Sequence, residues 1–156
     1  MGRDALEFDY YLSLAQLYDT TDLNMPSSSA QRIGAIAESK FITQCLERDF
    51  EPHVPTTPMP WDFIVTCPAG TLKVQIKSTS IKASANTYSI STCTGCRNKE
   101  KMDTALDVVG CYVIPEDMWW MLPREAVTGV TMKLNVSPIS KSKYKKYQEN
   151  WSIFYE

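Results

Sequence analysis

The sequence predicts an α/β (α+β) domain in which helices flank a mixed sheet, preceded by one extra N-terminal helix. In two early segments, apolar residues recur at three- and four-residue steps, which is the period of an amphipathic helix. Short β-branched or alternating runs follow, bounded by Pro, Gly and Ser, as strands are. The 156 residues are enough for a proper core. This order of helices and strands favours a layered mixed domain.

The first predicted helix covers residues 4–19, where Leu6, Tyr10 and Leu14 form an apolar stripe. Turn-forming residues then end the pattern. We therefore predict that residues 1–27 form a separate helix and linker. Because the apolar face must pack on the domain or on a partner subunit, this segment is a candidate oligomerisation element.

The domain itself is predicted to span residues 28–156 and to begin with a helix from Ser28 to about Arg48, with Phe41 on its apolar stripe. The next segment, 49–60, contains four prolines. We expect it to have no regular structure and to act as a constrained connection to the first strand.

A hairpin follows and carries the most informative side chains. Two strands, 62–66 and 71–77, flank a tight turn. Counting back from the turn pairs Asp62 with Gln75, and directly opposed residues share a face with Cβ atoms roughly 5 Å apart. Lys77 lies two residues beyond and points to the same face. An acid, an amide and an ammonium are thus predicted to converge on one side of a small sheet.

Shorter patterns predict the rest of the domain. They indicate a third strand at 87–92, a short helix near 98–106, a buried strand at 107–114, a strand at 118–122, an edge strand at 130–136, a weakly helical segment at 140–148 and a docked aromatic end at 151–155.

Composition excludes some protein classes. Hydrophobic residues make up 44% and charged residues 22%, as in soluble globular proteins. No apolar run approaches the ~20 residues that span a bilayer. With no signal-peptide pattern and five irregularly spaced cysteines, we expect reduced thiols in an intracellular protein.

The net charge of −2 does not indicate a nucleic-acid partner. Lysines gather in the last quarter of the sequence, where they form either a basic face for a partner or a solvated face.

Glu38 and Asp62 are the candidate acids. Glu38 has no lysine or arginine three or four residues away, so it lacks a helical ion-pair partner. Asp62 opens a strand, where aspartate is depleted. Each feature also has an ordinary structural explanation. Glu38 would then be a carboxylate at the boundary of the apolar stripe, and Asp62 a residue that starts a strand. Gln75 and Lys77 would lie on an exposed strand face. The pairing of Asp62 with Gln75 favours a functional site.

Chemistry explains why these residue types belong together. Mg²⁺ prefers oxygen ligands, usually one or two carboxylates with retained waters. Asp62 can supply the central carboxylate, the side-chain oxygen of Gln75 or a backbone carbonyl can add a ligand, and Glu38 can ligate a second ion or act through water. Lys77 can orient the attacking water or neutralise charge in the transition state.

Glu38 lies on a predicted helix, Asp62 at a strand start and Gln75-Ile76-Lys77 on the next strand. This order resembles the Glu…Asp…(Glu/Gln)-x-Lys pattern of the PD-(D/E)XK nucleases. The resemblance covers roughly residues 28–123 and implies a restriction-endonuclease-like αβββαβ core. It implies Mg²⁺-dependent hydrolysis of DNA phosphodiester bonds, with Mn²⁺ able to substitute. The implied catalytic residues are Glu38, Asp62, Gln75 and Lys77, and the implied metal ligands are Glu38, Asp62, Gln75 and Ile76.

Two positions depart from the family pattern. Trp61 stands where the family name has proline, with Pro60 one residue earlier, and Gln75 replaces the usual second acid. The sequence is thereby similar to a Gln-x-Lys subset that includes a group I intron homing endonuclease of cyanobacteria. Homing-type cutting and resolution of Holliday junctions are both compatible with this scaffold. A homodimer or homotetramer is expected, because two DNA strands require two sites.

Other residues carry open alternatives. The candidate nucleic-acid contacts are Lys73, Ser78, Arg97 and Lys99. The alternatives are that Ser78 only ends its strand and that Arg97 and Lys99 belong to a solvated loop. Cys93 and Cys96 form a lone C-x-x-C, and a structural zinc site needs four ligands. No phosphate-binding loop motif is present, so no nucleotide cofactor is expected. The competing hypotheses are a catalytically weak or inactive nuclease-like nucleic-acid-binding or interaction module and a thiol- or zinc-based binding protein.

Overall fold

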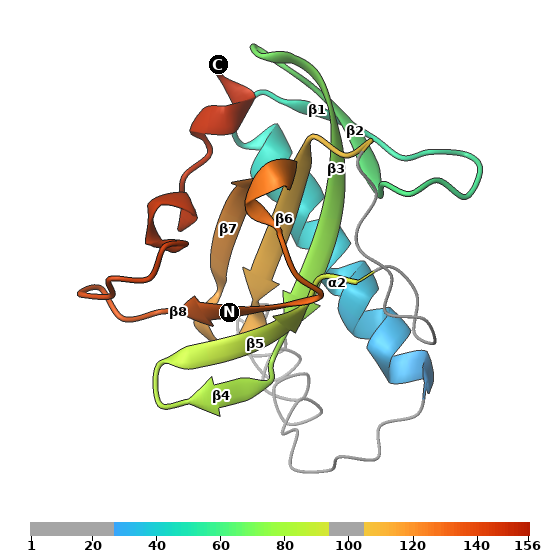
Figure 1. The fold of residues 1–156 in the computed structure, drawn as a ribbon. Coiled ribbons are helices and arrows are strands. Elements are labelled where there is room, and N and C mark those ends of the chain that lie inside the picture. The colour runs from blue at the N-terminus through green and yellow to red at the C-terminus, as the bar shows by residue number, and fades with distance from the viewer. Residues whose placement is uncertain (1–26, 94–104) are drawn as a thin grey trace, which may run out of the picture. The chain divides into compact units, whose positions relative to one another are not determined.

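The structure is a computed structural model that describes residues 27–93 and 105–156, shown in Figure 1. Residues 33–156 form one compact unit. The helix predicted at 4–19 lies outside the described residues, as does nearly all of the one predicted near 98–106. Among the described residues, no helix combines the length and apolar character needed to cross a membrane.

A mixed five-stranded sheet forms the centre of this unit, in the order β1-β2-β3-β6-β7. Strands β3 and β6 are parallel, and the other neighbouring strands are antiparallel. The strands are β1 (Glu51–His53), β2 (Phe63–Cys67), β3 (Gly70–Thr79), β6 (Val108–Val113) and β7 (Met118–Pro123). The predicted α+β class with a mixed sheet is confirmed.

Helix α2 (Ser27–Leu46) packs on one face of this sheet (Figure 1). Its buried stripe includes Phe41, whose ring centroid lies 5.2 Å from that of Phe63 on β2. The aromatic C-terminal end docks into the same cluster, as predicted, with Trp151 and Phe154 buried. The core on this side consists of Ala37, Phe41, Cys45, Phe50, Phe63, Val65, Val74, Ile76, Val108, Tyr112, Trp119, Met121, Trp151 and Phe154.

The opposite face is covered by a second sheet in the order β4-β5-β8. Its strands are β4 (Lys82–Ser84), β5 (Thr87–Ser91) and β8 (Thr131–Asn135). The strands predicted at 87–92 and 130–136 therefore exist, but β5 pairs with β4 and β8 rather than extending the main sheet. Buried side chains of β5 and β8 pack against those of β6 and β7.

The proline-rich segment corrects one prediction. Residues 49–60 were expected to have no regular structure, but Glu51–His53 form β1 and pair with β2. The prediction was wrong because β1 is an edge strand. An edge strand bonds on one side only, so it tolerates a residue such as Pro52 that has no N–H to donate.

Four single 3-10 turns complete the described part of the chain. They are η1 (Ile114–Glu116), η2 (Arg124–Ala126), η3 (Lys145–Tyr147) and η4 (Ser152–Phe154). The turn between β6 and β7 places Asp117 in the left-handed region, with φ of 49°. Of the helix predicted at 140–148, only the turn η3 forms.

Candidate active site

The β2–β3 hairpin has the register that the sequence predicts. Thr66 pairs with Thr71 and Phe63 with Val74, so Asp62 follows as the partner of Gln75. Just before β2, the backbone N–H of Asp62 donates to the carbonyl of Val74 at 2.9 Å. Register is fixed here because a one-residue slip would move every buried side chain of β3 to the other face.

The Asp62 carboxylate is held by two donors from β3. The Gln75 Nε2 amide donates to Asp62 Oδ2 at 2.8 Å, and the Ile76 backbone N–H donates to the same oxygen at 2.7 Å. Within the described part of the chain, Oδ1 accepts no hydrogen bond. The two donors therefore fix the orientation of the carboxylate and leave one oxygen for another partner.

Lys77 lies on the same face of β3 as Gln75. Its Nζ donates to the carbonyl of Cys93 at 3.2 Å, which uses one of the three N–H bonds of the ammonium. Burial raises the pKa of Asp62, while the hydrogen bond from Ile76 and the positive charge of Lys77 act to lower it. Burial has the larger effect, so the pKa of Asp62 lies above its ordinary value.

Glu38 approaches this site from helix α2. It is partly buried. Burial raises its pKa, and the negative charge of Asp62 raises it further. The structure thus brings Glu38, Asp62, Gln75 and Lys77 together, and it leaves two neighbouring carboxyl groups whose pKa values are both raised.

The donor set of this site consists of oxygen atoms. Two carboxylates, the Gln75 side-chain oxygen and the Ile76 backbone carbonyl are hard ligands that suit Mg²⁺ or Mn²⁺. Nowhere in 27–93 or 105–156 do three or more His, Cys, Asp or Glu side chains gather as a metal group. At this site the side chains are two carboxylates and the amide of Gln75.

Comparisons with known proteins identify the family of this chain. A family model described as PD-(D/E)XK endonuclease matches residues 28–154. The chain belongs to this family. The resemblance found in the sequence is therefore confirmed, and the match extends beyond residue 123 to the docked C-terminal end.

One solved structure shows the same fold. It is "The structure of a bacterial homing endonuclease: I-Ssp6803I", with a TM-score of 0.66 and 20% sequence identity. The match covers 78% of this chain and 88% of that chain. None of the curated proteins compared with the chain matches it.

Two of the four residues predicted to contact nucleic acid, Lys73 and Ser78, lie within the described residues of this PD-(D/E)XK domain. The backbone N–H of Lys73 donates to Asp107 Oδ2 at 2.7 Å, and its ammonium lies 4.5 Å from the Trp61 ring centroid. Ser78 is partly buried on β3. Arg97 and Lys99, and also Cys96 of the C-x-x-C, lie outside the described residues.

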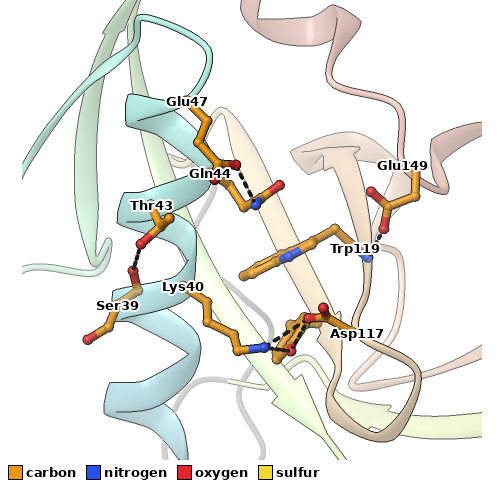
Figure 2. A network of polar contacts seen from close by, with 9 residues as sticks. Ser39, Lys40, Thr43, Gln44, Glu47, Asp117, Trp119 and Glu149 are labelled. Carbon is orange, nitrogen blue, oxygen red and sulfur yellow. Dashed lines mark hydrogen bonds and ion pairs between the residues drawn. The ribbon is translucent and has the colours of Figure 1, made fainter. Parts of the chain in front are cut away.

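A second polar cluster, which sequence reasoning missed, links α2 to the β6–β7 turn (Figure 2). Lys40 Nζ donates to Tyr112 Oη at 2.7 Å and to Asp117 Oδ1 at 2.9 Å, and Tyr112 Oη donates to the same Asp117 oxygen at 2.5 Å. These hydrogen bonds lower the pKa of Asp117. The short gap between the strands predicted at 107–114 and 118–122 was the available signal, but the helix residue that reaches it could not be read from the sequence.

Proposed function

We propose that this chain is a Mg²⁺-dependent endodeoxyribonuclease that hydrolyses phosphodiester bonds in DNA. The observation that carries the proposal is the Asp62 carboxylate, held by Gln75 and the Ile76 N–H, with Lys77 on the same face and Glu38 beside it. Membership of an endonuclease family supports the reaction class. The choice of DNA and of Mg²⁺ is our extension of it.

The donor set fits a divalent cation. Asp62 Oδ1, the Glu38 carboxylate, the Gln75 side-chain oxygen and the Ile76 carbonyl would hold Mg²⁺, with Mn²⁺ able to substitute. Burial and, to a smaller extent, the charge of Asp62 raise the pKa of Glu38, and a bound cation would offset both effects. Such an ion, when bound, polarises a phosphate oxygen and lowers the pKa of a bound water.

The side chains of this site have distinct roles in the proposal. Asp62 is pre-oriented by its two N–H donors, so it needs no rearrangement when substrate binds. Among the described residues, Lys77 gives one of its three N–H bonds, to Cys93, so two remain for substrate or water. Its positive charge can stabilise the negative charge that develops on the phosphate or orient the attacking water, and a single such donor is worth roughly 10²–10³-fold in rate.

Substitution of the two central residues tests this proposal. Lys77→Ala and Asp62→Ala should each abolish cleavage of plasmid DNA in Mg²⁺ or Mn²⁺ while the circular dichroism spectrum stays native. Both residues are only partly buried, so the fold should survive. Retained nicking by both variants would refute the assignment.

Assembly belongs to the same proposal. Cutting both strands of a duplex, or both sides of a four-way junction, requires two active sites. We therefore propose a homodimer or homotetramer of the domain at 28–156, joined through the helix predicted within 1–27. Light scattering of the full chain should give two or four copies, and cleavage of linear duplexes and four-way junctions in parallel should separate homing-type from junction-resolving activity.

One observation favours a second candidate. Gln75 leaves the site with two carboxylates in place of three, which suits a nuclease-like domain that binds nucleic acid but cuts weakly or not at all. DNA binding without cleavage, on linear, branched and supercoiled substrates in both metals, would favour that candidate.

A further inference from the structure

Charge is distributed very unevenly along this chain. The stretches 63–99 and 126–148 hold ten of its sixteen lysines and arginines and none of its eighteen aspartates and glutamates. The net charge of −2 is therefore the sum of a strongly basic part and a strongly acidic part. Such a separation creates a positive field wherever the two stretches meet in the fold.

The second sheet is where they meet. Strands β4 and β5 come from the first stretch and β8 from the second, and β5 pairs with β8 along its whole length. In Figure 1 this sheet is the lower pair of green strands with the orange β8 beside them. Folding thus brings Lys82 of the first stretch and Lys133 of the second into one sheet.

The outer face of this sheet is polar and lacks acids. Alternate residues of β5 and β8 are buried, so their partners point outward. The outward pairs are Thr87 with Asn135, Ser89 with Lys133, and Ser91 with Thr131. Glu116 meets the sheet through the buried Tyr88, whose hydroxyl donates to it at 2.7 Å, and so belongs to the inner face.

This face is suited to a phosphate backbone. Lys133, Thr131 and Ser91 are exposed, and lysine, serine and threonine are typical donors to phosphate oxygens. The hydroxyl side chains are short, so a duplex can approach the sheet closely. No large apolar side chain projects from the outward positions of β5 and β8, which does not favour a protein interface of the hydrophobic kind.

Strand β5 of this sheet ends close to the candidate active site. Ser91 ends β5, and the carbonyl of Cys93, two residues on, accepts the hydrogen bond from Lys77. Ser89, the partner of Lys133, is four residues from Cys93, a span of at most about 14 Å. That distance corresponds to roughly four base-pair steps of duplex DNA.

We propose that the outer face of β4-β5-β8 binds the phosphate backbone of duplex DNA a few base pairs from the scissile bond. Lys133 is its central cationic contact, and Ser91 and Thr131 are hydroxyl contacts between Lys133 and the active site. The inference rests on the proposed function for the identity of the partner, and it assigns the surface that holds this partner.

Equilibrium binding of a short fluorescent DNA duplex in EDTA tests the surface without cleavage. Lys133→Ala should weaken binding several-fold, and the slope of log K against log salt should become less steep by about 0.9, as for one lost phosphate contact. Thr131→Glu, which adds an acid to the same exposed face, should weaken binding at least as much. Both positions are exposed, so the melting temperature should stay within about 2 °C of wild type.

Lys146→Ala is the matched control. Lys146 is exposed and belongs to the same basic stretch, but it lies on η3 rather than on the second sheet. Its substitution should leave the affinity and the salt slope near wild type. Equal losses for Lys146→Ala and Lys133→Ala would assign binding to diffuse charge and overturn the proposed surface, as would wild-type binding by Lys133→Ala and Thr131→Glu.

The outcome separates this inference from the proposed function. If the wild-type chain binds and cuts DNA but the sheet variants behave like it, only the surface is wrong. If the wild-type chain neither binds nor cuts DNA in any metal, the proposed function and with it the surface are wrong. Where both hold, Lys133→Ala should raise KM and leave kcat near wild type, whereas Lys77→Ala should lower kcat.

Discussion

Helix α2 contributes residues to two polar clusters from positions only two residues apart. One cluster pairs opposite charges, whereas the other brings like charges together. Lys40 joins Tyr112 and Asp117 in a cluster with one cation, one anion and a shared hydroxyl (Figure 2). Glu38 instead approaches Asp62, so like charges meet. A helix turns about 100° per residue, which places Glu38 and Lys40 on nearly opposite sides.

The pKa directions express this difference. At the Lys40 cluster, burial acts to lower the pKa of Lys40, but the bonds to Tyr112 and Asp117 outweigh it and raise the pKa. At the candidate site, burial raises the pKa of both Glu38 and Asp62. The first cluster favours its charged forms and links helix to sheet, whereas the second leaves charges that a divalent cation would stabilise.

The largest expected effect separates the two clusters by activity. Lys77→Ala should reduce the cleavage rate by at least about a hundred-fold, because it removes the positive charge beside the phosphate. Lys40→Met, which removes a charge from the other cluster, should leave the rate unchanged. Single-turnover cleavage of a plasmid measures both. A comparable loss of rate in Lys40→Met would show that the clusters do not differ in function.

Gln75→Glu sharpens the description of the candidate site. A third carboxylate should tighten divalent-cation binding roughly tenfold, since cation affinity rises with ligand charge. Without the cation it should lower stability, because the amide donor to Asp62 is replaced by a like charge. Calorimetric titration with Mn²⁺ measures the first effect and thermal unfolding in EDTA the second. Weaker cation binding than wild type would contradict the ligand set.

Glu38→Gln tests the repulsion directly. In EDTA its melting temperature should equal or exceed that of wild type, because the substitution removes a partly buried carboxyl group whose pKa is raised by burial and by the charge of Asp62. Wild type with a cation at 100-fold its Kd should gain about 2.7 kcal/mol, and the variant should gain much less. Thermal unfolding with and without Mg²⁺ measures both quantities. A clear loss of stability in EDTA would mean that Glu38 is held by favourable contacts.

The pH dependence of stability follows from the same shifts. A carboxyl whose pKa is raised on folding stabilises the protein below its unfolded pKa, and this contribution is lost as pH rises through the folded pKa. The ordinary values are 4.5 for Glu38 and 3.8 for Asp62. In EDTA, the contribution of these two groups should therefore fall as pH rises from about 4, and Glu38→Gln should show a smaller fall. Denaturant unfolding at a series of pH values measures it.

The smallest effect concerns the other cluster. Lys40 and Asp117 are 46% and 73% exposed, so their ion pair should be worth only about 0.2–1 kcal/mol. Lys40→Met should therefore lower the melting temperature by no more than about 4 °C. A calorimetric scan measures this, and a much larger loss would indicate that the cluster holds α2 against the sheet.

The sequence predicted the hairpin and its polar face correctly because one face of β3 is buried at Val74 and Ile76, which leaves one register. Glu38 was identifiable because no lysine or arginine lies three or four residues from it, where a helical ion-pair partner would be. The second sheet was not predicted, because β5 and β8 are far apart in sequence and an alternating pattern does not indicate which strand will pair with it. Strand β1 was missed because proline is usually excluded from strands, whereas Pro52 lies on an edge strand that pairs on one side only.

The most direct test is a paired titration of the full-length protein with Mg²⁺ or Mn²⁺, followed by thermal unfolding and by cleavage of supercoiled DNA. The repulsion between Glu38 and Asp62 predicts that both stability and cleavage rise with cation concentration and share one midpoint. Lys77→Ala should keep the rise in stability and lose the cleavage. Cleavage without any cation, or no change in stability up to concentrations that saturate other magnesium sites, would contradict this account.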